Sequence, residues 1–73
     1  MASMGTRADF ALKRACRIAE IHTRTLDEVL LHIDPALAVW MVESRLVTLV
    51  DRTDSHRICG LTPLGIARAR EIR

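Results

Sequence analysis

The last third of the chain constrains the fold most. Residues 46–50 are rich in β-branched side chains, which favour a strand, and residues 53–56 are polar and suited to a turn. Residues 57–61 then return as a second strand. Thr62 can cap a helix that begins at Pro63, because proline at the first helical position loses no needed hydrogen bond. The sequence therefore predicts a short hairpin followed by a final helix.

The preceding part of the chain is predicted to be helical. Apolar residues recur every three or four positions over residues 7–22, which predicts a first helix with one buried face. A capping-box pattern at residues 25–28 predicts a short second helix over residues 26–32. Asp34 then caps a third helix over residues 35–45. A short helix, a tight turn and another helix match the helix-turn-helix unit.

The length of 73 residues predicts one small domain. We expect residues 1–6 to be a disordered or cloning-derived N-terminus and residues 7–73 to form the domain. A core this small leaves a narrow margin of stability, which favours a second copy or a partner that covers apolar surface. No apolar run is long enough to span a bilayer, so we expect a cytoplasmic protein without a membrane partner.

The potential metal ligands and nucleophiles are scattered. Cys16, Cys59 and the three histidines show no metal-ligand spacing, so we expect no metal site and no cofactor. The cysteines are expected to be two buried thiols in a reducing compartment. The histidines lack a recognisable nucleophile and orienting acid, and no phosphate-binding glycine loop is present. We therefore expect the protein not to be an enzyme.

Three short motifs point to a known family. They are Leu61-Thr62-Pro63-Leu64-Gly65, Glu43-Ser44-Arg45-Leu46-Val47 and the pair Asp54 and Arg57. Together with the order of predicted elements, they make residues 8–73 resemble a winged helix-turn-helix domain of the MarR-like transcriptional regulators. The resemblance implies a mainly α fold with a small β-hairpin: three helices, a two-stranded wing and a C-terminal helix. It also implies transcription regulation through duplex DNA. Arg45 departs from the family, which usually has glycine there in the left-handed region.

The basic side chains are concentrated at the two ends of the chain. Residues 1–24 carry five basic and two acidic side chains, and residues 55–73 carry four basic and one acidic, whereas residues 25–54 carry two basic and six acidic. No Lys or Arg lies between Arg24 and Arg45, so the third helix lacks the usual chemistry of a DNA-reading helix. DNA contacts are therefore predicted from the wing (Arg52, His56, Arg57), from the first helix (Lys13, Arg14, Arg17) and at phosphates (Thr25, Ser44, Arg45).

An alternative hypothesis assigns the third helix to protein binding. Its exit into the next strand predicts a core side formed by Leu37, Ala38, Met41, Val42 and Leu46, and an outward side formed by Ala36, Val39, Trp40, Glu43 and Ser44. Val39, Trp40 and Glu43 would then contact a second copy or another protein, with Trp40 as the anchor. A further interpretation makes Trp40 an ordinary core residue. The sequence leaves DNA binding and protein binding both open.

Overall fold

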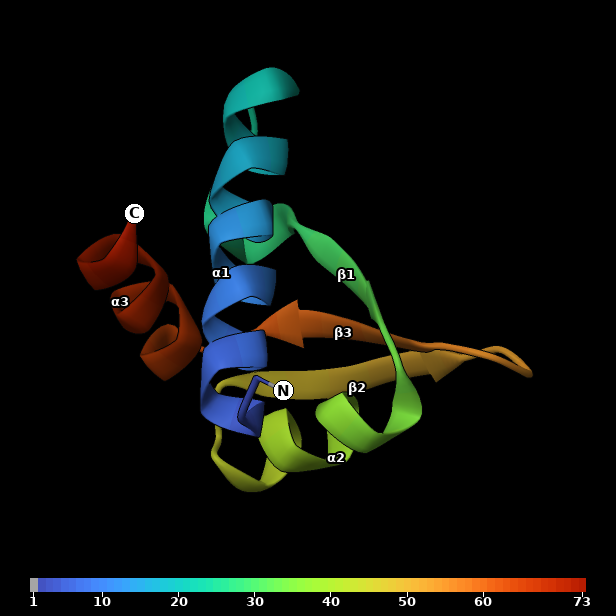
Figure 1. Cartoon of the computed structure of the whole chain (residues 1–73). Helices are drawn as coiled ribbons and strands as arrows, with labels where there is room; N and C mark the ends of the chain where they lie inside the picture. The colour runs from blue at the N-terminus through green and yellow to red at the C-terminus, as the bar shows by residue number, and fades with distance from the viewer. Residues whose placement is uncertain (1) are drawn as a thin grey trace.

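Three helices and a three-stranded antiparallel sheet form a mixed α/β domain in a computed structural model that describes residues 2–73 (Figure 1). In chain order the elements are α1 (Met4–Ile21), the 3-10 turn η1 (Leu26–Glu28), β1 (Leu30–Ile33), α2 (Pro35–Glu43), β2 (Val47–Arg52), β3 (Arg57–Leu61) and α3 (Pro63–Ile72).

Helix α1 begins three residues before its predicted start. The Ser3 hydroxyl accepts a hydrogen bond from the Thr6 amide at 3.2 Å and caps the helix, so residues 4–6 form its first turn. Met1 lies outside the described residues. One face of α1 is buried and rich in alanine, which allows α3 to approach closely. The two helices are also joined by a bidentate ion pair from Arg68 to Asp9, at 3.0 and 3.2 Å.

The prediction of a helix over residues 26–32 is wrong. Only Leu26–Glu28 turn as a 3-10 helix, and Leu30–Ile33 form strand β1, which pairs with β3 in the register Leu31 to Cys59. Leu31 and Ile33 are buried while Leu30 and His32 are exposed, which is the alternation of a half-buried strand. The spacing of apolar residues from 26 to 33 fits a helix as well as a strand, and the free edge of β3 decides between them. The hairpin therefore gains a third strand, and the predicted pair of helices is not formed.

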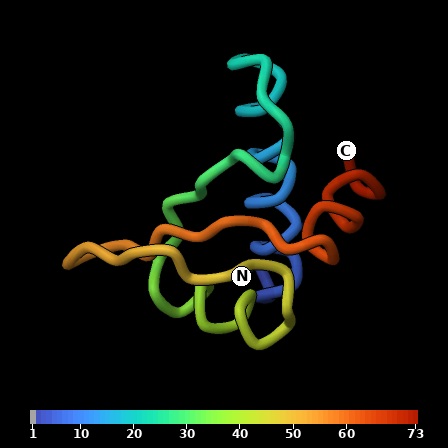
Figure 2. The backbone as a smooth tube through the Cα atoms, turned by 180° about the vertical axis from the view of Figure 1, so that it is seen from behind, coloured from blue at the N-terminus to red at the C-terminus, as the bar shows by residue number. Residues whose placement is uncertain are grey.

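The sheet has the order β1-β3-β2, which places β3 in the middle. Strands β2 and β3 form a hairpin with a bulge between Leu49 and Asp51, where the register shifts. Two views show that the free end of this hairpin projects beyond the helices, on the side away from α3 (Figures 1 and 2). The turn at that end is closed by hydrogen bonds between Thr53 and His56, with Thr53 N to His56 O at 2.9 Å.

The opposite end of the hairpin is fastened to the start of α3. The Thr62 hydroxyl donates to the Arg45 carbonyl at 2.6 Å and accepts from the Gly65 amide at 3.0 Å. The Thr62 amide donates to the Leu46 carbonyl at 3.1 Å. The backbone of Leu46 can approach this closely because Gly65 has no side chain. A Cβ on Gly65 would lie 1.9 Å from the Leu46 carbonyl oxygen. We call Arg45, Leu46, Thr62 and Gly65 the α2–α3 junction.

Arg45 has a φ of 62°, which is the left-handed conformation that the family resemblance implied for this position. The turn after α2 requires it, because the amides of Arg45 and Leu46 donate back to Val42 and Met41 at 3.0 Å each. The strained residue therefore lies inside the α2–α3 junction.

Helix α2 is rotated slightly from its predicted phase. Leu37, Ala38 and Met41 are buried as expected, but Val42 is 40% exposed and Trp40 is partly buried against the core. The Trp40 ring lies beside the start of α1, with its Cη2 atom 4.0 Å from the position of a Cβ on Gly5. The phase differs because α2 packs against α1 and β2 and not against the helix that was expected before it.

Candidate nucleic-acid interface

The ion pairs of the protein divide its basic side chains into two groups. Arg7 pairs with Asp34, Arg24 with Glu28, Arg68 with Asp9 and Glu71, and Arg73 with Glu20. In the described residues 2–73, no carboxylate lies within ion-pair distance of Arg70 or of the six cations predicted to contact DNA, which are Lys13, Arg14, Arg17, Arg45, Arg52 and Arg57. The charges of these six side chains are therefore not compensated within the fold.

Three of these cations lie along one side of α1. Lys13, Arg14 and Arg17 are exposed and line an open cavity of about 590 Å³, together with the Glu20–Arg73 ion pair. The Lys13 ammonium lies 5.9 Å from the centre of the Phe10 ring, close enough for a cation–π contact. This part of α1 is a basic surface that solvent and ligands can reach.

A second cavity connects α1 to the hairpin. It has a volume of about 270 Å³, and its lining includes Arg14 of α1, His32 of β1 and His56 of the hairpin turn. Arg14 also lines the first cavity, so the two cavities share this side chain. The structure thus brings Arg14 and His56, which lie far apart in the sequence, to one surface. We call Lys13, Arg14, Arg17, His32 and His56 the α1–hairpin face.

His32 was missed by the sequence reasoning, which placed it at the end of a helix. As part of β1 it is exposed, beside Ile33, which pairs with Arg57 at the base of the hairpin turn. Residues 30–33 read Leu-Leu-His-Ile, which does not alternate apolar and polar side chains, so no local signal in the sequence identified this strand.

The tip of the hairpin adds cations, but also acids. Arg52 and Arg57 are cross-strand neighbours, and the Arg57 guanidinium donates to the carbonyls of Thr53 and His56 at 3.2 Å each. Residues 51–57 contain two acidic side chains, Asp51 and Asp54, beside these two arginines. The hairpin tip therefore carries no net excess of positive charge. The excess positive charge of this surface comes mainly from α1.

Thr25, Ser44 and Arg45 are not brought to this surface. The Thr25 hydroxyl and amide donate to the Glu28 carboxylate at 2.8 and 3.2 Å. The hydroxyl bond is the main reason that the pKa of Glu28 is lowered. Ser44 ends α2 and Arg45 belongs to the α2–α3 junction, at the end of β2 opposite Arg52. These three residues therefore have structural roles in caps and turns.

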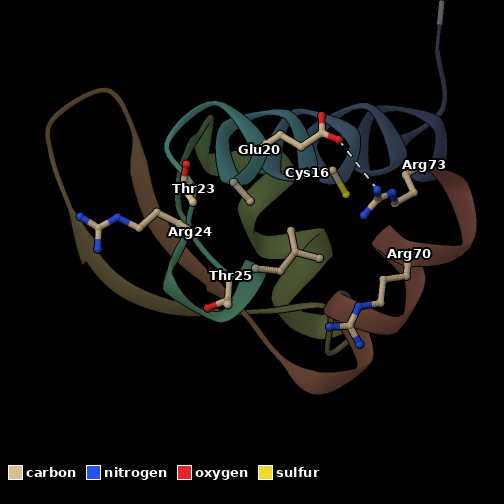
Figure 3. Close-up of a pocket in the computed structure, with 9 residues that line it drawn as sticks. Cys16, Glu20, Thr23, Arg24, Thr25, Arg70 and Arg73 are labelled. Atoms are coloured by element: carbon tan, nitrogen blue, oxygen red, sulfur yellow. Dashed lines mark ion pairs between the residues drawn. The ribbon is translucent and has the colours of Figure 1, made fainter.

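Thr25 also lines a cavity of about 480 Å³ between the end of α1, η1 and α3 (Figure 3). The Glu20–Arg73 ion pair spans one side of it at 3.8 Å, and Arg24 is paired with Glu28. Arg70 is the one arginine of this lining that forms no ion pair among the described residues. Apart from Arg70, the arginines of this lining are therefore compensated by carboxylates within the fold.

An apolar groove lies between α2 and β2. Val39 is 58% exposed, Val42 40% and Leu49 52%, and all three line a groove of about 240 Å³ with Glu43 and Arg57. We call these five residues the α2–β2 groove. Val39 and Glu43 were expected on the outward side of the helix, whereas Val42 was assigned to the core. Trp40 is not part of the groove.

No family model, curated protein or solved structure was found to match this chain. None of the helices formed by residues 2–73 has the length and apolar character needed to cross a membrane. Within the same residues, no three His, Cys, Asp or Glu side chains are grouped so that they could hold a metal ion. The cysteines of this part are both free thiols, and burial raises the pKa of Cys59.

Proposed function

We propose that this protein binds duplex DNA and acts as a small transcriptional regulator of the winged-helix type. The observation that carries the proposal is the separation of its cations into two groups. Four arginines form ion pairs with carboxylates, whereas the five predicted DNA-contacting cations other than Arg45 have no carboxylate partner in the described residues. Uncompensated cations are what a protein needs to displace counterions from the phosphate backbone.

The arrangement of the hairpin supports the same proposal. Its free end projects beyond the helices (Figure 1), which is the shape required of a wing that reaches along a groove of DNA. Arg52 lies at this end and is exposed, and arginines inserted into a narrow minor groove respond to its width. In this proposal Arg52 contacts the groove, while the α1–hairpin face contacts phosphates.

The outward side of α2 determines what kind of DNA binding is proposed. Val39, Val42 and Glu43 offer no donors to base edges, and the Glu43 carboxylate repels phosphate. Contacts to the backbone position a protein on DNA but carry little sequence information. We therefore expect binding that depends strongly on salt and weakly on base sequence.

Titration of generic duplex DNA at two or more salt concentrations tests this function. The expected result is binding at low salt that weakens as salt rises, with Arg14→Ala lowering the slope of log affinity against log salt by about 1. Arg70→Ala is the matched control, because Arg70 is also exposed and unpaired among the described residues but lies on α3. The slope of this control should stay close to that of the unmodified protein.

Absence of binding at low salt would contradict the proposal. Equal losses for Arg14→Ala and Arg70→Ala would also contradict it, since they would show that only the net charge of the protein matters.

Protein binding is the second candidate function, and the α2–β2 groove is the observation that favours it. Exposed apolar side chains that are grouped, and not scattered singly, mark interaction surfaces. The two functions do not exclude each other, because the groove shares only Arg57 with the predicted DNA contacts.

A further inference from the structure

The centre of the α2–β2 groove is aliphatic. Val39 and Val42 project from α2 and Leu49 from β2, and the buried Ala38 lies at the bottom between them. Each of the three larger side chains keeps between 40% and 58% of its surface in contact with water. Burying this surface against another apolar surface would be favourable, at roughly 25 cal/mol for each Å² removed from water.

Two opposite charges border this aliphatic centre. Glu43 and Arg57 line the same groove, and among the described residues neither takes part in an ion pair. The guanidinium of Arg57 is held in place by its bonds to the carbonyls of the hairpin turn. The groove thus combines exposed aliphatic side chains with one acid and one base that form no ion pair among the described residues.

We propose that the α2–β2 groove is the contact surface of a homodimer. In this dimer a twofold axis packs Val39, Val42 and Leu49 of one copy against the same residues of the other. The same axis sets Glu43 of each copy opposite Arg57 of the other, so that two ion pairs form. A contact of this kind is closed, because each copy uses the same patch.

The charges favour a second copy over an unrelated protein. An apolar patch alone could receive many partners, but an acid and a base placed together are each satisfied by the same patch rotated through 180°. The free edge of β2 is a poorer route to association, since the bulge after Leu49 interrupts its regular backbone spacing. Side chains of the groove, and not an extended sheet, therefore carry the contact.

The inference goes beyond the proposed DNA binding and does not depend on it. A dimer would present two α1–hairpin faces, which lie outside the groove, and would double the cations available to one duplex. Arg57 would then serve the dimer, and DNA contacts would fall to Arg52 and to α1.

Sedimentation velocity without DNA is the first test. The unmodified chain is expected to dimerise, and Val39→Glu to weaken the dimer at least about tenfold by placing a charge in the apolar contact. Leu64→Glu is the matched control, because Leu64 is 54% exposed on α3, away from the groove. It should leave the dimer intact. Circular dichroism checks that both variants remain folded.

A charge exchange provides the decisive test. Glu43→Lys alone places two bases together at the proposed contact, and Arg57→Glu alone places two acids together, so each variant should be monomeric. An equimolar mixture should dimerise again, because both contacts then join a base to an acid. No rearrangement within one chain can produce this recovery.

Three results would overturn the inference. The first is a chain that stays monomeric up to about 1 mM, which would leave the groove to a different protein. The second is a dimer that Leu64→Glu disrupts and Val39→Glu does not. The third is a mixture of the two charge variants that remains monomeric while the unmodified chain dimerises.

Discussion

The two ends of the β2–β3 hairpin differ in how they are held. At the end near α3, Val47 and Leu61 are paired and buried, and Thr62 joins the strands to the turn after α2. At the other end, Arg52 and Arg57 are paired beside a turn whose hydrogen bonds are local. One hairpin is therefore fixed to the rest of the fold at its closed end, and at its open end it carries two arginines that form no ion pair among the described residues. Substitutions at the two ends should have different consequences.

Gly65→Ala should have the largest effect on stability. A methyl group at this position would lie 1.9 Å from the Leu46 carbonyl oxygen, so the backbone of the α2–α3 junction must move. We expect the free energy of unfolding to fall by about 3 kcal/mol or more, which is a large part of the stability of a small domain. Urea denaturation followed by circular dichroism measures the loss.

Gly60→Ala is the control for this substitution. A Cβ on Gly60 would meet only the side chains of Val50 and Leu30, at 3.7 and 3.8 Å. Stability should stay the same or rise slightly, because alanine restricts the unfolded chain more than glycine does. Similar losses at Gly60 and Gly65 would show that the closed end is not specially constrained.

Two threonines provide the next comparison. Thr62 at the closed end and Thr53 at the open end each use their hydroxyl to cap a nearby amide, of Gly65 and His56 respectively. Thr62→Ala should lower the free energy of unfolding by about 1–2 kcal/mol, since it removes a helix cap and the bond to the Arg45 carbonyl. Thr53→Ala should cost less than about 0.5 kcal/mol, because its partners can bond to water. Thermal unfolding measures both losses. A larger loss for Thr53→Ala than for Thr62→Ala would contradict the difference between the two ends.

Arg45→Gly should have a small effect on stability, in the opposite direction from Gly65→Ala and Thr62→Ala. Glycine adopts the φ of 62° found here without the steric cost that arginine incurs. We expect the free energy of unfolding to rise by about 0.5–1 kcal/mol, reduced by the greater freedom of glycine in the unfolded chain. Ser44→Gly serves as the reference, because Ser44 has a φ of −81° and no such cost to relieve. A loss of stability at both positions would contradict a strained Arg45.

Several elements could be predicted from short stretches of sequence because local chemistry decides them. Asp34 caps α2 through the Leu37 amide at 3.1 Å, and Thr62 caps α3, as their positions before proline indicated. The two strands of the hairpin were also recognised, since β-branched residues flank a polar turn. In each case the deciding interactions join residues close together in the chain.

The errors arose where distant parts of the chain decide. Residues 30–33 form a strand because β3 offers an open edge, which no local pattern reveals. Trp40 is partly buried because its ring lies beside Gly5 at the start of α1, thirty-five positions earlier in the chain. The candidate site also depends on distant residues. The sequence identified the basic side chains, but it did not show which of them form ion pairs with carboxylates.

By itself, the sequence determined the caps of α2 and α3, the hairpin and the distribution of charge along the chain. Tertiary structure alone decided that β1 joins the sheet, that Arg14 and His56 share a cavity, and that Val39, Val42 and Leu49 form one groove. The physical reason is how far apart in the sequence the interacting residues lie. Caps and turns depend on hydrogen bonds between near neighbours, whereas strand pairing, ion pairing and shared surfaces depend on which distant residues the packed core brings together.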